Sequence, residues 1–315
     1  MLSRVADGLY WMSRYLERAE HTARVMGVQL NLMLEQDPQF SDRRWVRLLA
    51  SLGHPGPQSA RVDLFTLAQH YTSRQITGSI TSARENARHV REQISSEMWE
   101  QVNRLFHEVK RMESAGFSTT QPIDFLTFIV DASVQFQGVT DSTMNHGEGW
   151  QFIQLGRFIE RSDATARLLD LFFREFSRPQ LQTTDSGEHM EWVGLLRSCT
   201  AFEAYCKVYT ADLRPDRVAE FLLLNNEFPH SVRFACDQIQ QSLEAIHQLA
   251  STKRTAGVAK LAGRMRAGLT FTPLEEIVAG LADFCAEIQK QCGRIHSGLY
   301  EVFITYPIEA ALHQA

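Results

Sequence analysis

The chain has 315 residues, 44% of them hydrophobic and 22% charged, which is close to the average soluble protein and excludes a disordered or low-complexity chain. Its 32 basic and 37 acidic side chains give a formal net charge of −5. Because a dedicated nucleic-acid-binding protein usually carries a basic excess, this charge argues against that class.

Helical periodicity runs along the whole chain, because apolar residues recur at every third or fourth position between the prolines. We find no two-residue alternation typical of a strand. Long helices are predicted over residues 4–36, 78–114, 122–145, 148–176, 188–209, 230–251 and 273–304, the second broken near Ser95-Ser96. Shorter helices are predicted over residues 42–53, 60–72, 215–224 and 255–268. The expected fold class is all-α, a multi-helix bundle.

One segment repeats within the chain. Residues 14–24 align without a gap onto residues 157–167, at an offset of 143. The first arginine, a central Glu-Arg pair and a closing Thr-Ala-Arg are identical, and Tyr/Phe, Leu/Ile and Glu/Asp replace one another. We call the two helices that carry these copies the motif helices. A weaker echo of the pattern lies at residues 83–88.

The domain organisation follows from the repeat. We expect a single helical domain over residues 1–315, with two sub-bundles that each contribute one motif helix. The longest polar stretch, residues 177–187, suggests an alternative in which the chain divides into two lobes near residues 177–188.

A helical wheel assigns positions on the first motif helix. Its core face is predicted to run from Trp11 to Met33, with Arg14, Glu17 and Arg18 along one border. The opposite face is predicted to be solvated. There Glu20 and Arg24 form an i,i+4 surface pair, as do Asp163 and Arg167 in the second copy.

Two interpretations of the border residues remain open. Glu17, Arg18, Glu160 and Arg161 form a structural ion-pair network that joins the motif helices, or they line a ligand site between them. A guanidinium binds a carboxylate in a two-pronged geometry, which suits the network, and clustered arginines suit a phosphate or carboxylate ligand. In the second interpretation, Arg84 and Arg88 complete an anion site with Arg18 and Arg161.

The candidate site residues share the Glu-Arg motif or its surroundings. The candidates for binding an anion or a partner are Arg14, Arg18, Arg24, Arg84, Glu85, Arg88, Arg157, Arg161 and Arg167. The aromatic residues that flank them are Tyr10, Trp11, Tyr15 and Trp150, which belong either to the core or to a pocket wall with stacked arginines.

On these residues the sequence resembles the bacterial alpha-E family, all-helical proteins of unknown function that are named for a Glu-Arg motif. The resemblance covers most of the chain. It is carried by residues 2–20, by Ser82–Arg88, by Gly149-Trp150 with Leu155–Arg157 and Glu160-Arg161, and by Val218–Leu224 with Phe228–Ser231. At His230 the resemblance predicts an arginine, and its absence argues against anion binding by that turn.

The resemblance implies partners. Family members are associated with, or fused to, a circularly permuted ATP-grasp ligase, often beside a transglutaminase-like cysteine peptidase. The implied role is in peptide synthesis or peptide modification. We therefore expect a non-catalytic or co-catalytic helical protein that binds the ligase or its peptide or amino-acid substrate.

The sequence lacks stand-alone catalytic motifs. It contains no phosphate-binding glycine loop and no nucleophile elbow, and Glu-x-x-His occurs once, at Glu244, where a di-metal carboxylate bundle needs two. We expect no metal and no cofactor, and we expect the five cysteines to be mostly buried small apolar residues. Without a signal sequence or a long apolar stretch, the expected location is the cytoplasm, with no membrane contact.

Two rival functions remain. In the first, the protein is itself an enzyme in which Glu17 or Glu160 acts as a general base, while Arg18, Arg161 and Arg88 hold a carboxylate or phosphate. In the second, it is a structural oligomer whose motif forms a buried ion-pair network. The substrate and the oligomeric state do not follow from the sequence.

Overall fold

A computed structural model describes residues 3–35, 41–54, 63–176, 186–210, 212–250 and 253–305, and every regular element in these ranges is helical. The α-helices are α1 (Ser3–Glu35), α2 (Ser41–Ser51), α3 (Leu64–His89), α4 (Ser96–Ser114), α5 (Phe117–Thr120), α6 (Pro122–Thr143), α7 (Glu148–Phe176), α8 (Ser186–Ser198), α9 (Phe202–Tyr209), α10 (Pro215–Leu224), α11 (Val232–Ala250), α12 (Lys253–Phe271), α13 (Leu274–Ala279) and α14 (Leu281–Tyr300). A 3₁₀ turn, η2 (Arg91–Gln93), and a π-helical turn, η3 (Glu301–Thr305), complete the elements. The predicted all-α multi-helix bundle is confirmed.

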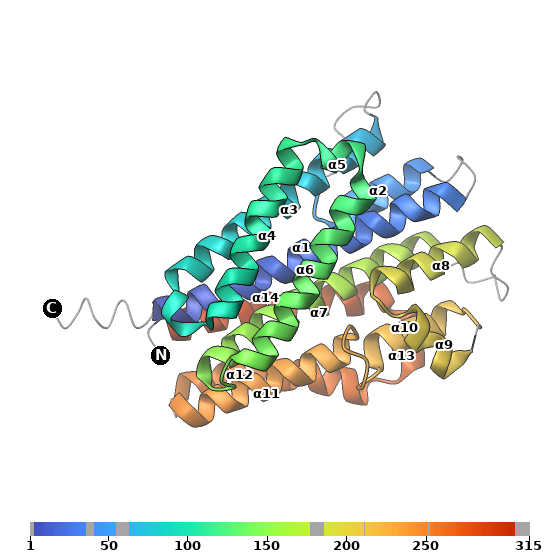
Figure 1. The fold of residues 1–315 in the computed structure, drawn as a ribbon. Coiled ribbons are helices and arrows are strands. Elements are labelled where there is room, and N and C mark those ends of the chain that lie inside the picture. The colour runs from blue at the N-terminus through green and yellow to red at the C-terminus, as the bar shows by residue number, and fades with distance from the viewer. Residues whose placement is uncertain are drawn as a thin grey trace.

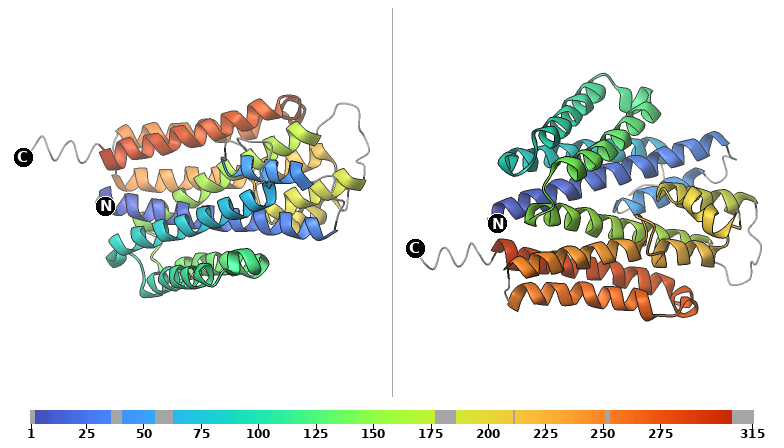
Figure 2. Two further views of the ribbon diagram at one scale, coloured as in Figure 1. Left: turned by 90° about the horizontal axis from the view of Figure 1, so that it is seen from above. Right: turned by 60° about the horizontal axis from the view of Figure 1, so that its bottom comes forward.

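The motif helices α1 and α7 run side by side through the middle of the molecule (Figure 1). On one side α3 and α6 pack against α1, with α4 beyond them. On the other side α11 and α14 pack against α7, and α12 covers that pair (Figure 2). The short helices α2, α8, α9 and α10 gather at the end of the bundle away from the N-terminus. Each motif helix is thus the inner helix of one half of the bundle.

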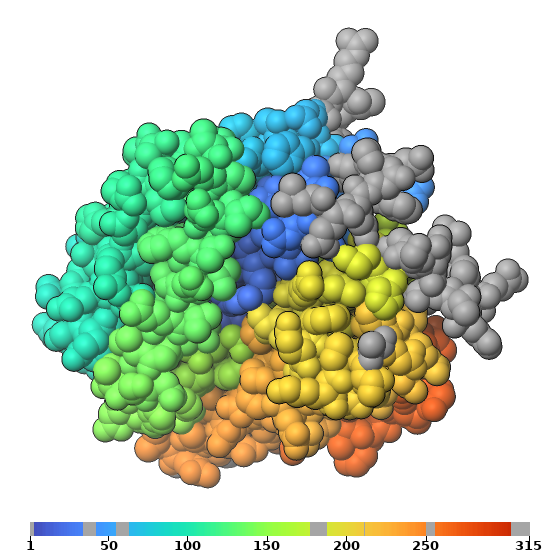
Figure 3. All heavy atoms as spheres, turned by 45° about the vertical axis from the view of Figure 1, so that its right-hand side comes forward, coloured from blue at the N-terminus to red at the C-terminus, as the bar shows by residue number. Residues whose placement is uncertain are grey.

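The central position of α1 overturns one prediction. Leu9, Leu16 and Val25 are buried as fully as the predicted core face, and so is Glu20. Because α3, α6, α7 and α8 pack around α1, no whole face of α1 is solvated, and from the side shown in Figure 3 it is visible as a strip between its neighbours. The prediction that Glu20 and Arg24 form a solvated surface pair is therefore wrong, because the Arg24 side chain is also only 19% exposed.

Several predicted helix boundaries are confirmed and others are wrong. The helices predicted at 4–36, 122–145, 148–176, 215–224 and 230–251 match α1, α6, α7, α10 and α11 within two residues. The predicted helix at 60–72 and the first part of 78–114 form one continuous helix, α3. The helix predicted at 188–209 breaks at Thr200, whose φ is 53°, and the one predicted at 273–304 breaks at Gly280. The proposed lobe division lies mostly outside the described residues.

Candidate functional site

The motif helices approach each other closely at Gly156. A Cβ atom on Gly156 would lie 2.3 Å from the carbonyl oxygen of Tyr10, so only glycine permits this packing. Next to it, the Ser13 hydroxyl donates to the carbonyl oxygen of Ile153 over 2.7 Å. Ser13 and Gly156 are themselves 143 residues apart, as are Tyr10 and Ile153. The repeat therefore appears in space as a local two-fold relation between α1 and α7.

One turn further along, each motif glutamate binds the motif arginine of the other helix. Arg161 Nε and Nη2 donate to the two carboxylate oxygens of Glu17 over 2.5 and 3.0 Å. In the reciprocal contact, Arg18 Nε and Nη2 donate to Glu160 over 2.6 and 3.1 Å. Arg14 Nε also donates to Glu160, over 2.8 Å. We call these five residues the motif cluster.

The two halves of the motif cluster differ in exposure. The side chains of Glu17 and Arg161 are 3% and 7% exposed, whereas that of Arg18 is 35% exposed. The Glu17–Arg161 pair thus joins the helices inside the core, as the structural interpretation predicts. The Glu160–Arg18 pair borders solvent, which leaves room for the ligand interpretation as well.

Neither motif glutamate is well placed to act as a general base. Burial alone would raise the pKa of Glu160, but the charges and hydrogen bonds of Arg14 and Arg18 outweigh it and hold that pKa below its ordinary value. Glu17 is engaged by Arg161 through both oxygens and receives a third contact, from Gln137 Nε2 at 3.4 Å. Both carboxylates therefore serve as fixed negative partners for arginines.

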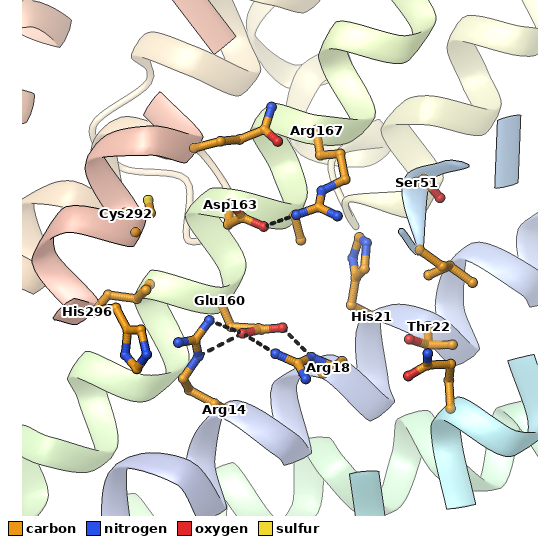
Figure 4. A pocket seen from close by; sticks show the side chains of 16 residues that line it. Arg14, Arg18, His21, Thr22, Ser51, Glu160, Asp163, Arg167, Cys292 and His296 are labelled. Carbon is orange, nitrogen blue, oxygen red and sulfur yellow. Dashed lines mark hydrogen bonds and ion pairs between the residues drawn. The ribbon is translucent and has the colours of Figure 1, made fainter. Parts of the chain in front are cut away.

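A polar cavity of about 360 Å³, which we call the open pocket, adjoins the Glu160 side of the motif cluster (Figure 4). It lies between α1, α7 and α14, with α2 and α3 at its edge. Its polar lining residues are Arg14, Arg18, His21, Thr22, Ser51, Gln75, Glu160, Asp163, Arg167, Gln289, Cys292 and His296. Arg167 donates to Asp163 over 2.7 Å, so three arginines face two carboxylates in this pocket. The excess of positive charge suits an anionic ligand.

Other titratable groups of the open pocket are uncharged at neutral pH. Burial lowers the pKa of His21 to about 4, and its Nε2 atom is buried with no hydrogen-bond partner in the described residues. Burial raises the pKa of the Cys292 thiol to about 12, which disfavours a thiolate nucleophile. Among the described residues, no group of three His, Cys, Asp or Glu side chains is arranged to hold a metal ion.

The aromatic residues of the first motif helix support the arginines. Arg14 lies 5.1 Å from the Trp11 ring centre, and Arg18 lies 5.6 Å from that of Tyr15. Arg14 Nη1 also donates to the Tyr10 hydroxyl over 3.1 Å. These rings hold the two guanidinium groups in place against Glu160.

A family model described as a predicted alpha-helical domain with a conserved ER motif, alpha-E, matches residues 1–304. The chain belongs to the alpha-E family. Glu17-Arg18 and Glu160-Arg161 are the two Glu-Arg pairs of this alpha-E chain, and they bind each other across the motif helices.

Longer mycobacterial proteins are related to this alpha-E chain. An uncharacterised protein of Mycobacterium bovis is 24% identical over 327 residues, which cover 95% of this chain and 36% of the relative. An uncharacterised protein of Mycobacterium tuberculosis H37Rv has the same identity and coverage. The alpha-E chain thus spans about a third of the length of these relatives. No solved structure matches it significantly. In the described part, none of its helices has the length and apolar character needed to cross a bilayer.

The structure does not bring all the candidate residues together. Arg84, Glu85 and Arg88 lie on α3 and do not line the open pocket: Arg84 donates to Asn103 over 2.9 Å and to Glu85 over 2.7 Å, and Arg88 donates to Glu85. They therefore do not complete an anion site with Arg18 and Arg161.

Three further candidates also lie apart from the open pocket. Trp150 stacks on His146, with ring centres 4.3 Å apart. Arg157, the counterpart of Arg14, contacts Gln154 at 3.5 Å instead of Glu17, and burial lowers its pKa to about 10. Arg24 donates to Glu20 on the far side of α1 from the pocket.

A second buried ion-pair cluster was not predicted. Arg44 Nε donates to Glu191 over 2.5 Å, and Arg47 donates both to Glu191 and, over 2.6 Å, to Glu175. We call these four residues the α2–α8 cluster. They have no repeat and no regular spacing, so the sequence contains no signal for them. Thr22 lines the open pocket but was not among the predicted site residues. Its identity with Thr165 in the repeat was a signal that could have identified it.

Proposed function

We propose that this alpha-E protein is a non-catalytic helical partner of an ATP-grasp ligase, and that its open pocket holds the carboxylate-bearing amino-acid or peptide substrate of that ligase. The observation that carries the proposal is the open pocket itself, a water-accessible cavity in which Arg14, Arg18 and Arg167 outnumber Glu160 and Asp163. Its volume lies at the lower end of the range usual for small-ligand sites, about 300–1,000 Å³.

The chemistry of the pocket favours binding over catalysis. The low pKa of Glu160 makes it a weak base, and the raised pKa of Cys292 keeps the thiol protonated. His21 is neutral at neutral pH, and no described residue makes a hydrogen bond to its Nε2 atom. The bond-forming step therefore falls to the partner, which is the role that ATP-grasp enzymes fill in the implied peptide-synthesis or peptide-modification systems.

The length of the relatives supports a partnership. In the mycobacterial proteins about two thirds of the polypeptide lies outside the matched region, so the alpha-E part works within a larger protein. A free-standing alpha-E chain would meet its ligase, and a transglutaminase-like peptidase, as separate subunits in the cytoplasm, where ATP is supplied.

Co-expression with an ATP-grasp ligase from the same genome tests the partnership. We expect the two proteins to purify together and ligase turnover to fall when alpha-E is omitted. A ligase that neither binds alpha-E nor responds to it would refute the partnership.

A pocket-filling variant tests the site. Gly293 lines the pocket, and a Cβ atom there meets nothing within 4 Å, so Gly293→Phe adds an aromatic ring at the pocket wall without a clash at its Cβ atom. The matched control is Gly268→Phe on α12, which has the same open surroundings away from the pocket. We expect only Gly293→Phe to reduce ligase stimulation. Equal stimulation by both variants would show that the pocket is not the substrate site.

A further inference from the structure

The 143-residue relation gives the motif-helix pair two equivalent faces, and only one of them is open. Four charged residues of the open pocket are Arg18, Glu160, Asp163 and Arg167. At the 143-residue offset their counterparts are, in the same order, Arg161, Glu17, Glu20 and Arg24. These four counterparts line a cavity of only about 10 Å³ on the other side of the motif helices. We call that side the filled face. The two faces thus share these four positions but differ in what covers them and in Arg14, which lines the open pocket while its counterpart Arg157 contacts Gln154.

A turn of the chain itself occupies the filled face. Arg161 uses its third nitrogen, Nη1, to donate to the carbonyl oxygen of Pro229 over 3.1 Å. The Thr165 hydroxyl donates to the next carbonyl oxygen, that of His230, also over 3.1 Å. Two consecutive peptide carbonyls therefore satisfy the motif arginine and the motif threonine of α7.

This turn is firmly held in place. The Asn225 side chain accepts from the backbone nitrogens of Glu227 and Phe228 over 2.9 and 2.8 Å, and the Ser231 hydroxyl accepts from the backbone nitrogen of Phe234 over 3.0 Å. Burial lowers the pKa of His230, so this side chain enters the filled face uncharged. On the filled face, motif residues therefore bind the peptide backbone of the same chain.

On the open face the same two donors have no acceptor among the described residues. Arg18 engages Glu160 through Nε and Nη2, as Arg161 engages Glu17, but within the described ranges its Nη1 makes no hydrogen bond. The Thr22 hydroxyl, the counterpart of Thr165, likewise has no hydrogen bond to any described residue, although Thr22 is only 2% exposed. Both residues line the cavity instead.

We infer that the open pocket binds a short peptide in an extended or turn conformation, whose two consecutive carbonyl oxygens accept hydrogen bonds from Arg18 and Thr22, as Pro229 and His230 do on the filled face. The inference rests on the proposed function, in which this pocket binds a ligand, and it names the recognised group as the peptide backbone.

Two glutamines supply the complementary acceptors. Gln75 Nε2 already donates to the Tyr71 hydroxyl over 2.9 Å, and Gln289 Nε2 donates to the Cys285 carbonyl over 3.3 Å. The amide oxygen of each side chain can accept from a peptide N–H group, and the second N–H of each amide can still donate. A simple anion has no N–H group to donate to these oxygens, whereas a peptide backbone has both N–H and carbonyl groups, so the mixed donors and acceptors of the pocket match a peptide backbone.

Calorimetric titration of the full chain with small probes tests this inference. The probes are acetyl-Phe-Pro-His-Ser-amide, which copies residues 228–231 and has no charged ends, a second blocked peptide, acetyl-Ala-Ala-Ala-amide, and the simple anions acetate and phosphate. We expect a blocked peptide to bind with one-to-one stoichiometry and the anions to bind at least about tenfold more weakly, because each lost neutral hydrogen bond accounts for about that factor.

Matched variants locate the binding. Thr22→Val keeps the size of the side chain and removes its hydroxyl, so we expect about tenfold weaker peptide binding. Thr165→Val is the control on the filled face, where affinity stays unchanged and the melting temperature falls. Should Thr22→Val not fold, Gly293→Phe serves instead and is expected to abolish peptide binding.

The outcomes separate the inference from the proposed function. If only free carboxylates bind, the backbone inference is wrong and the substrate-holding function stands. If a blocked peptide binds but folded Thr22→Val matches the wild type, the inference is likewise wrong. If no probe binds, the inference is overturned, and the ligase co-purification decides the partnership independently.

Discussion

The motif cluster and the α2–α8 cluster are built from the same two residue types but differ in their surroundings. In the α2–α8 cluster, Arg44 and Glu191 are 3% and 2% exposed, and the Arg47 guanidinium lies 4.1 Å from the Phe172 ring centre. In the motif cluster, Arg18 keeps one nitrogen at the wall of a cavity. Buried arginine–glutamate pairs thus serve either to fix neighbouring helices or, where a donor stays unsatisfied, to present a binding group.

The largest expected effect comes from breaking the α2–α8 cluster. Glu191→Gln leaves Arg44 and Arg47 as buried charges without their shared carboxylate, and we expect the free energy of unfolding to fall by about 3–5 kcal/mol. Urea denaturation measures the loss. As the control, Glu175→Gln removes a partner that is 26% exposed and should cost about 1 kcal/mol or less. A small effect of Glu191→Gln would contradict the view that this cluster is structural.

The next prediction compares the two motif glutamates. Glu17→Gln leaves the buried Arg161 without its carboxylate partner and should lower the free energy of unfolding by about 3 kcal/mol. Glu160→Gln should cost only about 1 kcal/mol, because water in the open pocket can hydrate Arg14 and Arg18, but it should disturb Arg18 and weaken peptide binding. Denaturation and titration of both variants check this. Equal losses of stability would show that the two halves are equally structural.

A smaller effect concerns pH and His21, which lines both faces. Burial lowers the pKa of His21 to about 4 from 6.5, so the unfolded chain takes up a proton first as the pH falls. Its contribution to stability is complete above pH 6.5 and is lost as the pH falls from 6.5 to about 4. We expect His21→Gln to reduce the loss of stability over this window by about 1–3 kcal/mol in denaturation series.

That comparison controls for a second histidine. Burial, the largest cause, lowers the pKa of His230 in both proteins, so that part of its contribution cancels from the difference; the smaller effect of the His21 charge on His230 remains in it. Parallel pH profiles for the two proteins would show that His21 is hydrated in the folded state.

The smallest effect is expected on α3. Arg88 is 53% exposed and pairs only locally with Glu85, so Arg88→Ala should change the unfolding free energy by less than about 0.5 kcal/mol and leave peptide binding unchanged. A clear loss of peptide binding by this variant would show that Arg88 on α3 contributes to the binding site.

Much of the fold was predictable because helical periodicity and the repeat are local patterns. The periodicity predicted α1, α6, α7, α10 and α11 closely, and the repeat singled out Glu17-Arg18 and Glu160-Arg161. The periodicity did not predict the helix break at Thr200, which depends on the backbone conformation of one residue. It also predicted two helices where the structure has the single helix α3. The wheel also failed for Glu20, since it assumes that one face meets solvent.

By itself, the sequence determined an all-helical chain of near-average composition and a pair of motif helices, 143 residues apart, that carry the same charged residue types. Only the tertiary structure decided that each glutamate takes the other helix's arginine, that the turn at Pro229-His230 fills one face, and that the other face stays open. The physical reason is that periodicity and repeats act along the chain. Which groups end up satisfied, however, depends on elements that meet only when the bundle closes.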